Sequence, residues 1–236
     1  MEIIYLKDEK TSMHDFLEEA LTNDIITGVF LSGTITKDNI PVVLNPTFYE
    51  DTVGVNYTFA EIQQMEQYDV ISLEEILNIL ASYNKKIVLN VLPIYLFDVT
   101  QENLEEIIIN AREYMTIFKS VLDLFPNENI YICTPVQRSL FLLQEIIKNR
   151  KVGLVVTMFN LTYVDIDFYV FDIKMVNMNI IIQELNRMKE LMIATITRSD
   201  IQMADQLFST PENALILDQL QFITDYPNEL HKALTD

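Results

Sequence analysis

Short runs of β-branched and aromatic residues alternate along the chain with longer stretches in which apolar side chains recur every three or four positions. The short runs have the period of a β-strand, and the longer stretches have the period of an amphipathic helix. Such alternation is typical of a parallel sheet covered by helices. The pattern predicts strands at residues 2–6, 26–35, 41–45, 87–92, 130–133, 152–156, 168–171, 191–197 and 222–224.

Helices are predicted between these strands, at residues 12–21, 72–80, 104–125, 140–149, 180–190, 200–208 and 229–234. The clearest helix start is at Ser72, because Glu75 stands three residues later and completes a capping box. Residues 36–39 are polar and turn-like, which predicts a hairpin or an extended ribbon between the second and third strands. Residues 46–70 are less regular and hold one short helical piece near 59–65.

About eight strand–helix units follow one another without a linker, a charge block or a repeat. They predict one domain over residues 1–236, folded as a closed (β/α)8 barrel of the TIM type, which takes about 250 residues. A doubly wound open sheet is the alternative, but it has fewer units and a crevice for a nucleotide. The chain holds four glycines. These cannot supply a Gly-rich dinucleotide fingerprint or a phosphate-binding loop.

The charge balance excludes several kinds of partner. Lys and Arg total 16 against 35 Asp and Glu, so the formal net charge is −19. Such a surface repels nucleic acid and anionic membranes. We see no targeting signal and no run of about 18 apolar residues that would form a membrane span. The single cysteine, Cys133, excludes an internal disulfide and a Cys-rich metal site. We therefore expect a cytoplasmic protein.

Five segments, in chain order, resemble the glycerophosphodiester phosphodiesterase family. Residues 28–48, GVFLSGTITKDNIPVVLNPTF, are similar to that family's second-strand pattern G-x-E-x-D-V-x-x-T-x-D-G-x-P-V-x-x-H-D. The others are ISLEEILNIL (71–80), KKIVLNVL (85–92), MIATITRSD (192–200) and FITDYPNEL (222–230), which is close to the family's I-x-T-D-x-P-x-x-L. The resemblance covers nearly the whole chain, with a shortened region near 46–70. It implies the PLC-like phosphodiesterase barrel and metal-assisted cleavage of a phosphodiester into an alcohol and glycerol 3-phosphate.

That chemistry needs carboxylates to hold Ca²⁺ or Mg²⁺, two histidines for proton transfer and a cation near the phosphate. The matched positions of this chain carry other groups. The two histidines are matched by Leu6 and Asn45, and the second-strand metal ligands by Phe30 and Ser32. On the third strand, the metal-binding Glu is matched by Asn90, and the Lys two residues later by Leu92. Lys7 alone keeps the charge of its counterpart, an Arg.

Leucine and phenylalanine neither bind a metal nor move a proton, and neutral Ser and Asn side chains are weak ligands. We therefore expect no metal cofactor and a catalytically inactive barrel, a pseudoenzyme. It would act as an interaction, regulatory or ligand-binding protein, with a protein partner or a second copy of itself. A ligand-binding form would hold a phosphate ester through Lys7, Ser32, Asn45 and Asn90.

A divergent but active phosphodiesterase is the alternative. It requires relocated acids such as Asp98, Asp165 and Asp225 to meet at the barrel mouth. Asp165 forms a second candidate metal site with Asp167 and Asp172, although such a cluster is more often a solvated loop.

Other reactive residue types have plain structural interpretations. We expect His14 and His231 to face solvent, Cys133 to be a packed thiol, and the pair Thr224–Asp225 to cap the final loop. On the predicted helix 104–125, Ile109, Ile117 and Leu124 lie outside the apolar stripe. They either pack on neighbouring helices or form part of a partner surface.

Overall fold

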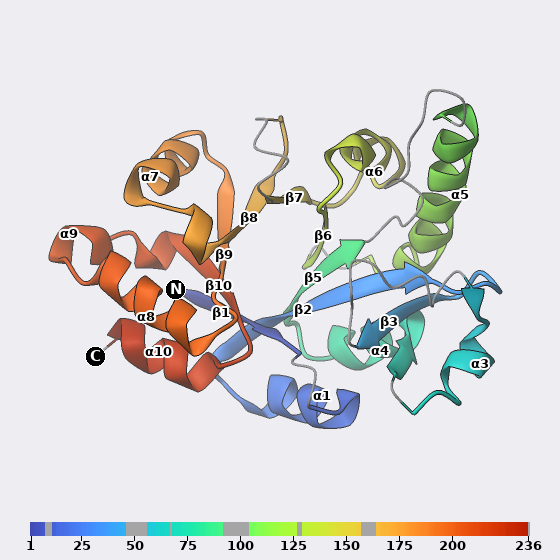
Figure 1. Cartoon of the computed structure of the whole chain (residues 1–236), viewed down its shortest axis with the longest axis horizontal. Helices are drawn as coiled ribbons and strands as arrows, with labels where there is room; N and C mark the ends of the chain where they lie inside the picture. Colours follow the sequence, from blue (N-terminus) through green and yellow to red (C-terminus); the bar gives the residue numbers. More distant parts are fainter. Residues whose placement is uncertain are drawn as a thin grey trace.

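Parallel strands close on themselves to form a barrel, with helices on its outside (Figure 1). The computed structural model describes residues 1–7, 11–45, 56–66, 68–91, 104–126, 129–156 and 164–235, without the side chains of 45 and 104–109. Closure comes from β1, which pairs in parallel with both β10 and β2. The barrel strands are β1 (Glu2–Leu6), β2 (Ile26–Ile35), β5 (Lys86–Val91), β6 (Ile130–Thr134), β7 (Val152–Val156), β8 (Phe168–Asp172), β9 (Glu190–Ala194) and β10 (Leu220–Thr224). The predicted eight-stranded barrel is confirmed, and the open-sheet alternative is wrong.

Two further strands extend the sheet beside β2. β3 (Pro41–Asn45) pairs with β2 in antiparallel fashion, which confirms the predicted hairpin. Its turn contains Asn39 at φ 62°, a left-handed conformation that asparagine tolerates well. β4 (Asp69–Ser72) pairs with β3, again antiparallel, in a region that the sequence pattern left irregular.

Helices follow most of the barrel strands and pack on the outside of the barrel (Figure 1). They are α1 (Met13–Thr22), α4 (Leu73–Ala81), α5 (Leu104–Leu122), α6 (Leu140–Ile146), α7 (Met178–Asn186), α8 (Arg198–Phe208) and α10 (Pro227–Thr235). Shorter pieces are α3 (Phe59–Ile62), α9 (Pro211–Ala214) and the 3₁₀ turns η2 (Gln137–Ser139), η3 (Ile173–Met175) and η4 (Leu217–Gln219). Within the described residues, no helix has both the length and the apolar character that crossing a bilayer requires.

Side-chain caps set several helix starts. At α4, the Ser72 hydroxyl accepts the N–H of Glu75, which is one half of the predicted capping box. Complete boxes form at α3 and α8, where Thr197 and Asp200 satisfy each other's backbone N–H groups. The predicted starts of α7 and α8 are two residues late, because the caps are Asn177 and Thr197. The predicted end of β9 at Thr197 is also wrong, since the strand ends at Ala194 and Thr197 begins the helix.

Two apolar layers hold the fold together. The larger lies between strands and helices, and a smaller one fills the barrel interior. In the smaller layer, Phe168 occupies space left by Gly153, whose added Cβ would stand 2.4 Å from the phenyl ring. The interior layer consists of buried side chains, among which Phe30 and Tyr131 are slightly more exposed than the rest. The others are Ile4, Val88, Cys133, Phe168, Val170, Met192 and Ile223.

The amino-terminal end of the barrel is closed by charged and polar side chains. Lys86 pairs with Glu2 at 2.5 Å, and Lys151 pairs with Glu190. Both ammonium groups lie 5.0 Å from the centre of the Tyr131 ring; Lys86 begins β5, and Lys151 immediately precedes β7. Cations over a tyrosine face gain about 0.5–1 kcal/mol or more where they are desolvated. This layer seals the end opposite the one where the matched site residues gather.

Candidate functional site

Four of the predicted site residues meet at the carboxyl ends of three adjacent strands. In the register of the sheet, Leu6 on β1 lies beside Phe30 on β2, and Ser32 on β2 lies beside Asn90 on β5. Leu6 and Phe30 also belong to the apolar layer inside the barrel. Barrel enzymes carry their reacting groups at this end of the strands. The structure thus places these four side chains where a (β/α)8 enzyme would hold its site.

The four side chains bring little chemistry to this place. Phe30 is 9% exposed and Leu6 is half-buried, so both act as packing residues. Asn90 is 2% exposed, and its amide oxygen has no hydrogen-bond partner among the described residues. A neutral amide oxygen is a weak ligand for a divalent cation compared with a carboxylate. The described part of the mouth therefore offers neither a charged ligand nor a titratable group on these strands.

The described side chains at this place leave one small cavity between them. A cavity of about 20 Å³ lies between β1, β2 and β3, lined by Leu6, Lys7, Phe30, Ser32, Leu44 and their neighbours. A cavity needs about 10–15 Å³ to hold one water molecule. A glycerophosphodiester is many times larger than the volume that these side chains leave open.

Lys7 lines the same cavity, but its charge is engaged elsewhere. Its ammonium group donates to the carbonyl oxygen of Thr11 and lies 3.6 Å from a carboxylate oxygen of Asp69. The same carboxylate oxygen accepts the backbone N–H of Met13 at the start of α1. Lys7 and Asp69 thus join β1, β4 and α1. Asp69 was not predicted from the sequence, although the β-branched pair Val70–Ile71 before the Ser72 cap is the signal of its short strand.

The remaining two predicted site residues are only partly visible. Asn45 ends β3, and its backbone lies opposite Asp69 in the register of β3 and β4. The side chain of Asn45 and the whole of Leu92 fall outside the described residues. Of the seven predicted positions, the structure therefore brings together Leu6, Lys7, Phe30, Ser32 and Asn90.

The acids considered as a replacement metal site have separate structural partners. A carboxylate oxygen of Asp167 accepts the N–H of Val152 at 2.8 Å. Asp165 accepts from the ammonium group of Lys189 at 3.0 Å, and Asp172 accepts the N–H of Lys174 at 2.8 Å. Asp98 lies outside the described residues. Asp165, Asp167 and Asp172 are thus engaged in local contacts at the two ends of β8. Asp225 directly follows β10, and one of its carboxylate oxygens is buried.

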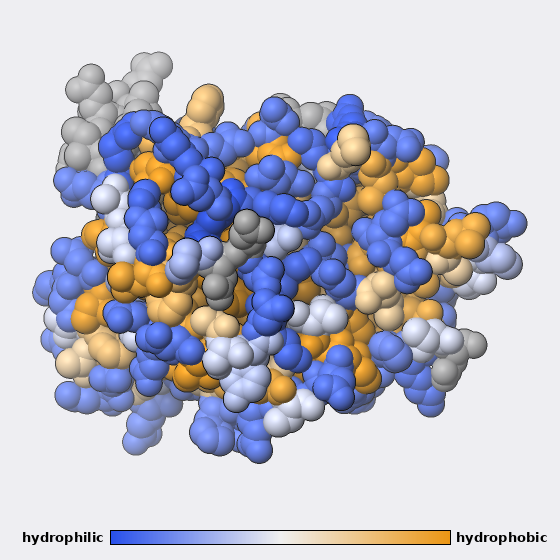
Figure 2. Space-filling view, turned by 180° about the vertical axis from the view of Figure 1, so that it is seen from behind, coloured by the Kyte–Doolittle hydropathy of each residue, from blue (hydrophilic) through white to orange (hydrophobic). Residues whose placement is uncertain are grey.

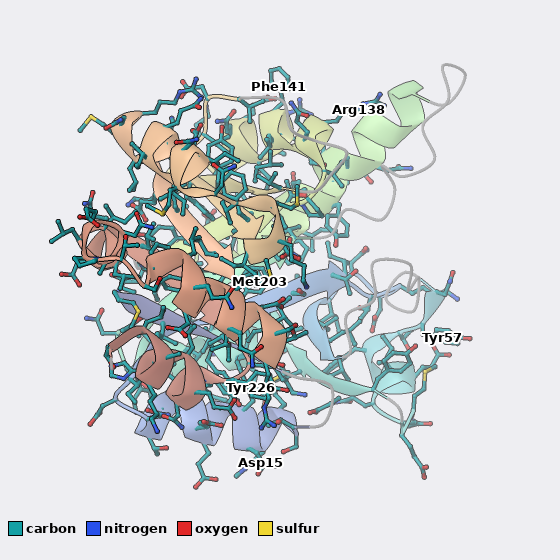
Figure 3. All side chains as sticks on the ribbon, turned by 60° about the vertical axis from the view of Figure 1, so that its left-hand side comes forward. Asp15, Tyr57, Arg138, Phe141, Met203 and Tyr226 are labelled. Carbon is teal, nitrogen blue, oxygen red and sulfur yellow. The ribbon has the colours of Figure 1, made fainter. Side chains whose placement is uncertain are left out.

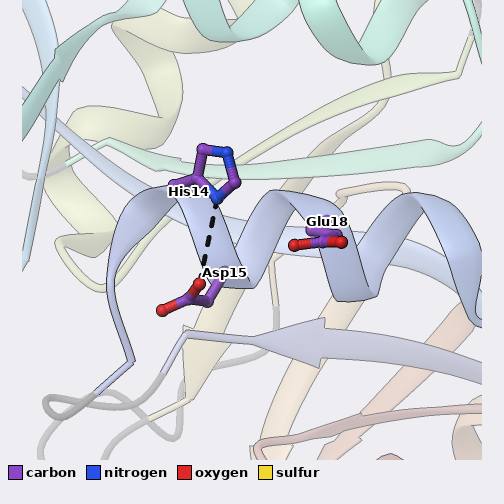
Figure 4. A group of neighbouring side chains, drawn as sticks. All are labelled: His14, Asp15 and Glu18. Carbon is purple, nitrogen blue, oxygen red and sulfur yellow. Dashed lines mark ion pairs between the residues drawn. The ribbon is translucent and has the colours of Figure 1, made fainter.

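In the described part of the chain, only His14, Asp15 and Glu18 place three metal-type ligand atoms close together (Figure 4). The His14 Nδ1 atom lies 3.8 Å from a carboxylate oxygen of Asp15. All three side chains are exposed on α1, outside the barrel, where water competes for any cation. His14 is exposed as predicted, whereas His231 is half-buried.

A second group of polar residues fixes the loops beside the mouth. The Thr224 hydroxyl donates to the carbonyl oxygen of Thr195 at 2.8 Å and accepts the N–H of Tyr226, so Thr224 holds the final loop, which is one half of the predicted Thr224–Asp225 cap. Lys174 lies 2.9 Å from the buried carboxylate of Asp200. Burial alone would raise the pKa of Asp200. Hydrogen bonds from Lys174 and Thr197 outweigh it and hold that pKa below its usual value.

Cys133 lies inside the barrel and is fully buried, which confirms the prediction of a packed thiol. Burial raises the pKa of this thiol far above its usual range. A thiol that stays protonated is a poor nucleophile and a poor metal ligand.

No family model matches the chain, and no curated protein is similar to it in sequence. Solved structures do match. A phosphodiesterase from Oleispira antarctica, in complex with the product sn-glycerol-3-phosphate, has a TM-score of 0.74 at 14% identity, covering 100% of this chain and 97% of that one. A glycerophosphodiester phosphodiesterase from Parabacteroides distasonis has a TM-score of 0.66 at 15% identity, over 99% and 97%. One from Agrobacterium tumefaciens has a TM-score of 0.64 at 10% identity, over 98% and 99%.

These likenesses confirm the predicted resemblance at the level of the fold. The chain has the barrel fold of the glycerophosphodiester phosphodiesterases over almost its full length. Identities of 10–15% do not carry the activity across, because function depends on the side chains of the site.

Proposed function

We propose that this chain is a phosphodiesterase-like barrel that does not hydrolyse phosphodiesters and acts through binding. One observation carries the proposal: the strand ends that would hold the reacting groups present Leu6, Phe30, Ser32 and Asn90. None of these side chains is charged, and none titrates near neutral pH.

The physical argument concerns what a divalent ion and a proton require. Ca²⁺ and Mg²⁺ exchange water for several oxygen ligands, usually with carboxylates among them. Ser32 and Asn90 offer neutral oxygens only, so they compensate poorly for the lost hydration. Leu6 and Phe30 have no atom that accepts or donates a proton, so general acid–base catalysis has no group on these strands.

A phosphate ester bound at the mouth without cleavage is less well supported than a protein partner. The described cavity holds about 20 Å³, and the Lys7 ammonium group is already engaged with Asp69 and Thr11. A phosphate would have to displace those contacts to use Lys7. We therefore favour a role for the outer surface of the barrel.

The outer surface offers several small apolar contacts. Phe141 is 79% exposed on α6, Tyr57 lies before α3, and Met203 is on α8, so the three side chains lie apart (Figure 3). Figure 2 shows apolar residues in separate groups among hydrophilic ones on the face that it presents. Small separate patches suit a weak or transient protein contact rather than an obligate interface.

A divergent active phosphodiesterase is the second candidate. The observation in its favour is the shared fold with the Oleispira antarctica phosphodiesterase, which was solved with sn-glycerol-3-phosphate. This candidate requires a bound divalent cation, held by residues other than the four strand-end side chains.

Calorimetric titration of the protein with Ca²⁺ and with Mg²⁺ separates the two candidates. Our proposal expects no saturable site tighter than about 0.1 mM, because the exposed acids give only weak, non-saturating heat. A saturable site of one ion per chain would support the active phosphodiesterase instead.

A further inference from the structure

The carboxyl-terminal ends of α5 and α6, which pack side by side (Figure 1), border a second and larger hollow on the outside of the barrel. Its volume is about 590 Å³, and its lining shares no residue with the cavity at the strand ends of β1 and β2. Small-molecule sites commonly have volumes of about 300–1,000 Å³. The volume of the hollow therefore suits a small organic ligand, and the side chains that line it determine which kind.

One part of the lining is apolar. Ile146 and Ile147 come from the end of α6, and Pro126 comes from the segment after α5. Ile147 is 4% exposed and forms a fixed floor, whereas Ile146 is half-buried and Pro126 is exposed. A ligand with an apolar body would remove the accessible parts of these side chains from water.

The acids on the rim are neutralised by neighbouring bases. Asp123 forms an ion pair with Lys119, one turn earlier on α5. Glu145 accepts two hydrogen bonds from the Arg112 guanidinium group, at 2.9 and 3.0 Å. Neither carboxylate is therefore free to attract a cation into the hollow.

The bases on the rim are Lys119, Lys148 and Arg150, and they differ in their contacts. The Arg150 guanidinium group donates to the carbonyl oxygens of Leu122 and Phe125 at the end of α5. Lys148 is exposed and, within the described residues, makes no hydrogen bond or ion pair, although its charge helps to lower the pKa of nearby Glu145. The rim thus presents one ammonium group without a close hydrogen-bond partner among the residues that the structure describes, beside an apolar floor, while Glu145 is held mainly by Arg112.

We infer that this hollow binds a small organic carboxylate with an apolar body, its carboxylate on Lys148 and its body on Ile146, Ile147 and Pro126. A single ammonium group matches one negative charge. Phosphate recognition usually uses several donors or the fork of an arginine, and both Arg112 and Arg150 are occupied here. The net charge of −19 repels anions at long range, but physiological salt screens that field within about 8 Å.

Calorimetric titration with octanoate tests the inference. Octan-1-ol, which lacks the negative charge, and acetate, which lacks the apolar body, are the matched probes. We expect octanoate to bind more tightly than either probe. Lys148→Gln should weaken octanoate binding about fivefold, the size of one exposed ion pair. Lys232→Gln, an exposed lysine on α10, is the control and should leave the affinity unchanged.

Two results would overturn the inference: no octanoate binding by the wild-type protein, or binding that Lys148→Gln leaves unchanged. Thermal unfolding of each variant shows that it is folded, so an effect of the substitution is an effect on the site. The inference concerns a site apart from the barrel mouth, and its failure would leave the proposal of an inactive barrel untouched.

Discussion

Ser32 and Asn90 lie beside each other in the parallel register of β2 and β5, at the carboxyl-terminal end of the barrel. Ser32 is half-buried and lines the cavity beside Lys7, whereas Asn90 is buried. In the resembling family, these two positions belong to residues that hold the metal. The proposed inactivity therefore depends most directly on these two neutral side chains, which lie in register.

Replacing both by acids should create a response to metal. In Ser32→Asp/Asn90→Glu, two carboxylates would stand side by side and destabilise the fold through repulsion and burial. Ca²⁺ would relieve that repulsion, so millimolar Ca²⁺ should raise the Tm of this variant and not that of the wild type.

The neutral variant Ser32→Asn/Asn90→Gln is the matched control, since it adds volume without charge. Thermal unfolding with Ca²⁺ or with a chelator measures the difference. A folded acidic variant that ignores Ca²⁺ would show that positions 32 and 90 do not correspond to metal positions.

Phe30 should be essential for stability, because it packs inside the barrel beside Leu6. Phe30→Glu removes a buried ring and buries a carboxylate without a partner. We expect the free energy of unfolding to fall by at least about 3 kcal/mol. Phe141→Glu is the control, since Phe141 is 79% exposed and its replacement should change the stability little. Equal urea midpoints for the two variants would contradict the packing role of Phe30.

Asp200 should make stability depend on pH in the acidic range. Its pKa lies below the ordinary 3.8, so its contribution is complete above that value and disappears as the pH falls through the pKa of the folded state. Asp200→Asn should lower the free energy of unfolding by about 1–3 kcal/mol at pH 7, because the contact with Lys174 is lost.

The difference between Asp200→Asn and the wild type should begin to shrink as the pH falls below the ordinary carboxyl pKa of 3.8, and it should continue to shrink until the folded wild-type carboxylate takes up a proton at its lower pKa. Urea unfolding at pH 7 and pH 3 measures it. Asp205→Asn, an exposed position on the same helix, should show no such difference at either pH. A constant gap for Asp200→Asn at both values would rule out the proposed ion pair.

Gly153 and Phe168 should behave as a coupled pair. A Cβ at position 153 would stand 2.4 Å from the Phe168 ring, so Gly153→Ala should destabilise the protein by about 1–3 kcal/mol. Phe168→Leu makes room, so the double variant should lose less stability than the sum of the two single variants. Additive losses in chemical unfolding would mean that the clash does not occur.

The regular part of the fold is predictable from the sequence because its signals are local. Alternating apolar runs locate the barrel strands, and the polar turn at residues 36–39 locates the hairpin. The predicted bounds are wrong at the ends of elements, because a single capping side chain determines where a helix begins. The β-branched residues near Thr197 predict that it ends a strand. In the structure its hydroxyl accepts the N–H of Asp200, so Thr197 caps the start of α8.

The sequence predicts only those site residues that match motif positions of the resembling family. Leu6, Phe30, Ser32 and Asn90 could be placed together because strands in register bring equivalent ends to one edge. The contact between Lys7 and Asp69 could not be foreseen, since it joins residues 62 positions apart through a four-residue strand with a weak signal. The hollow beside Lys148 likewise depends on how α5 and α6 pack, which no local pattern encodes.

The most direct test of the inactive barrel is turnover itself. Purified protein is incubated with glycerophosphocholine and either Ca²⁺ or Mg²⁺, and the release of glycerol 3-phosphate is followed against heat-denatured protein. We predict no release above that blank, because Leu6, Phe30, Ser32 and Asn90, at the ends of β1, β2 and β5, offer neither a charged ligand nor a proton-transfer group. Release that scales with the amount of protein and stops when the metal is chelated would contradict the account.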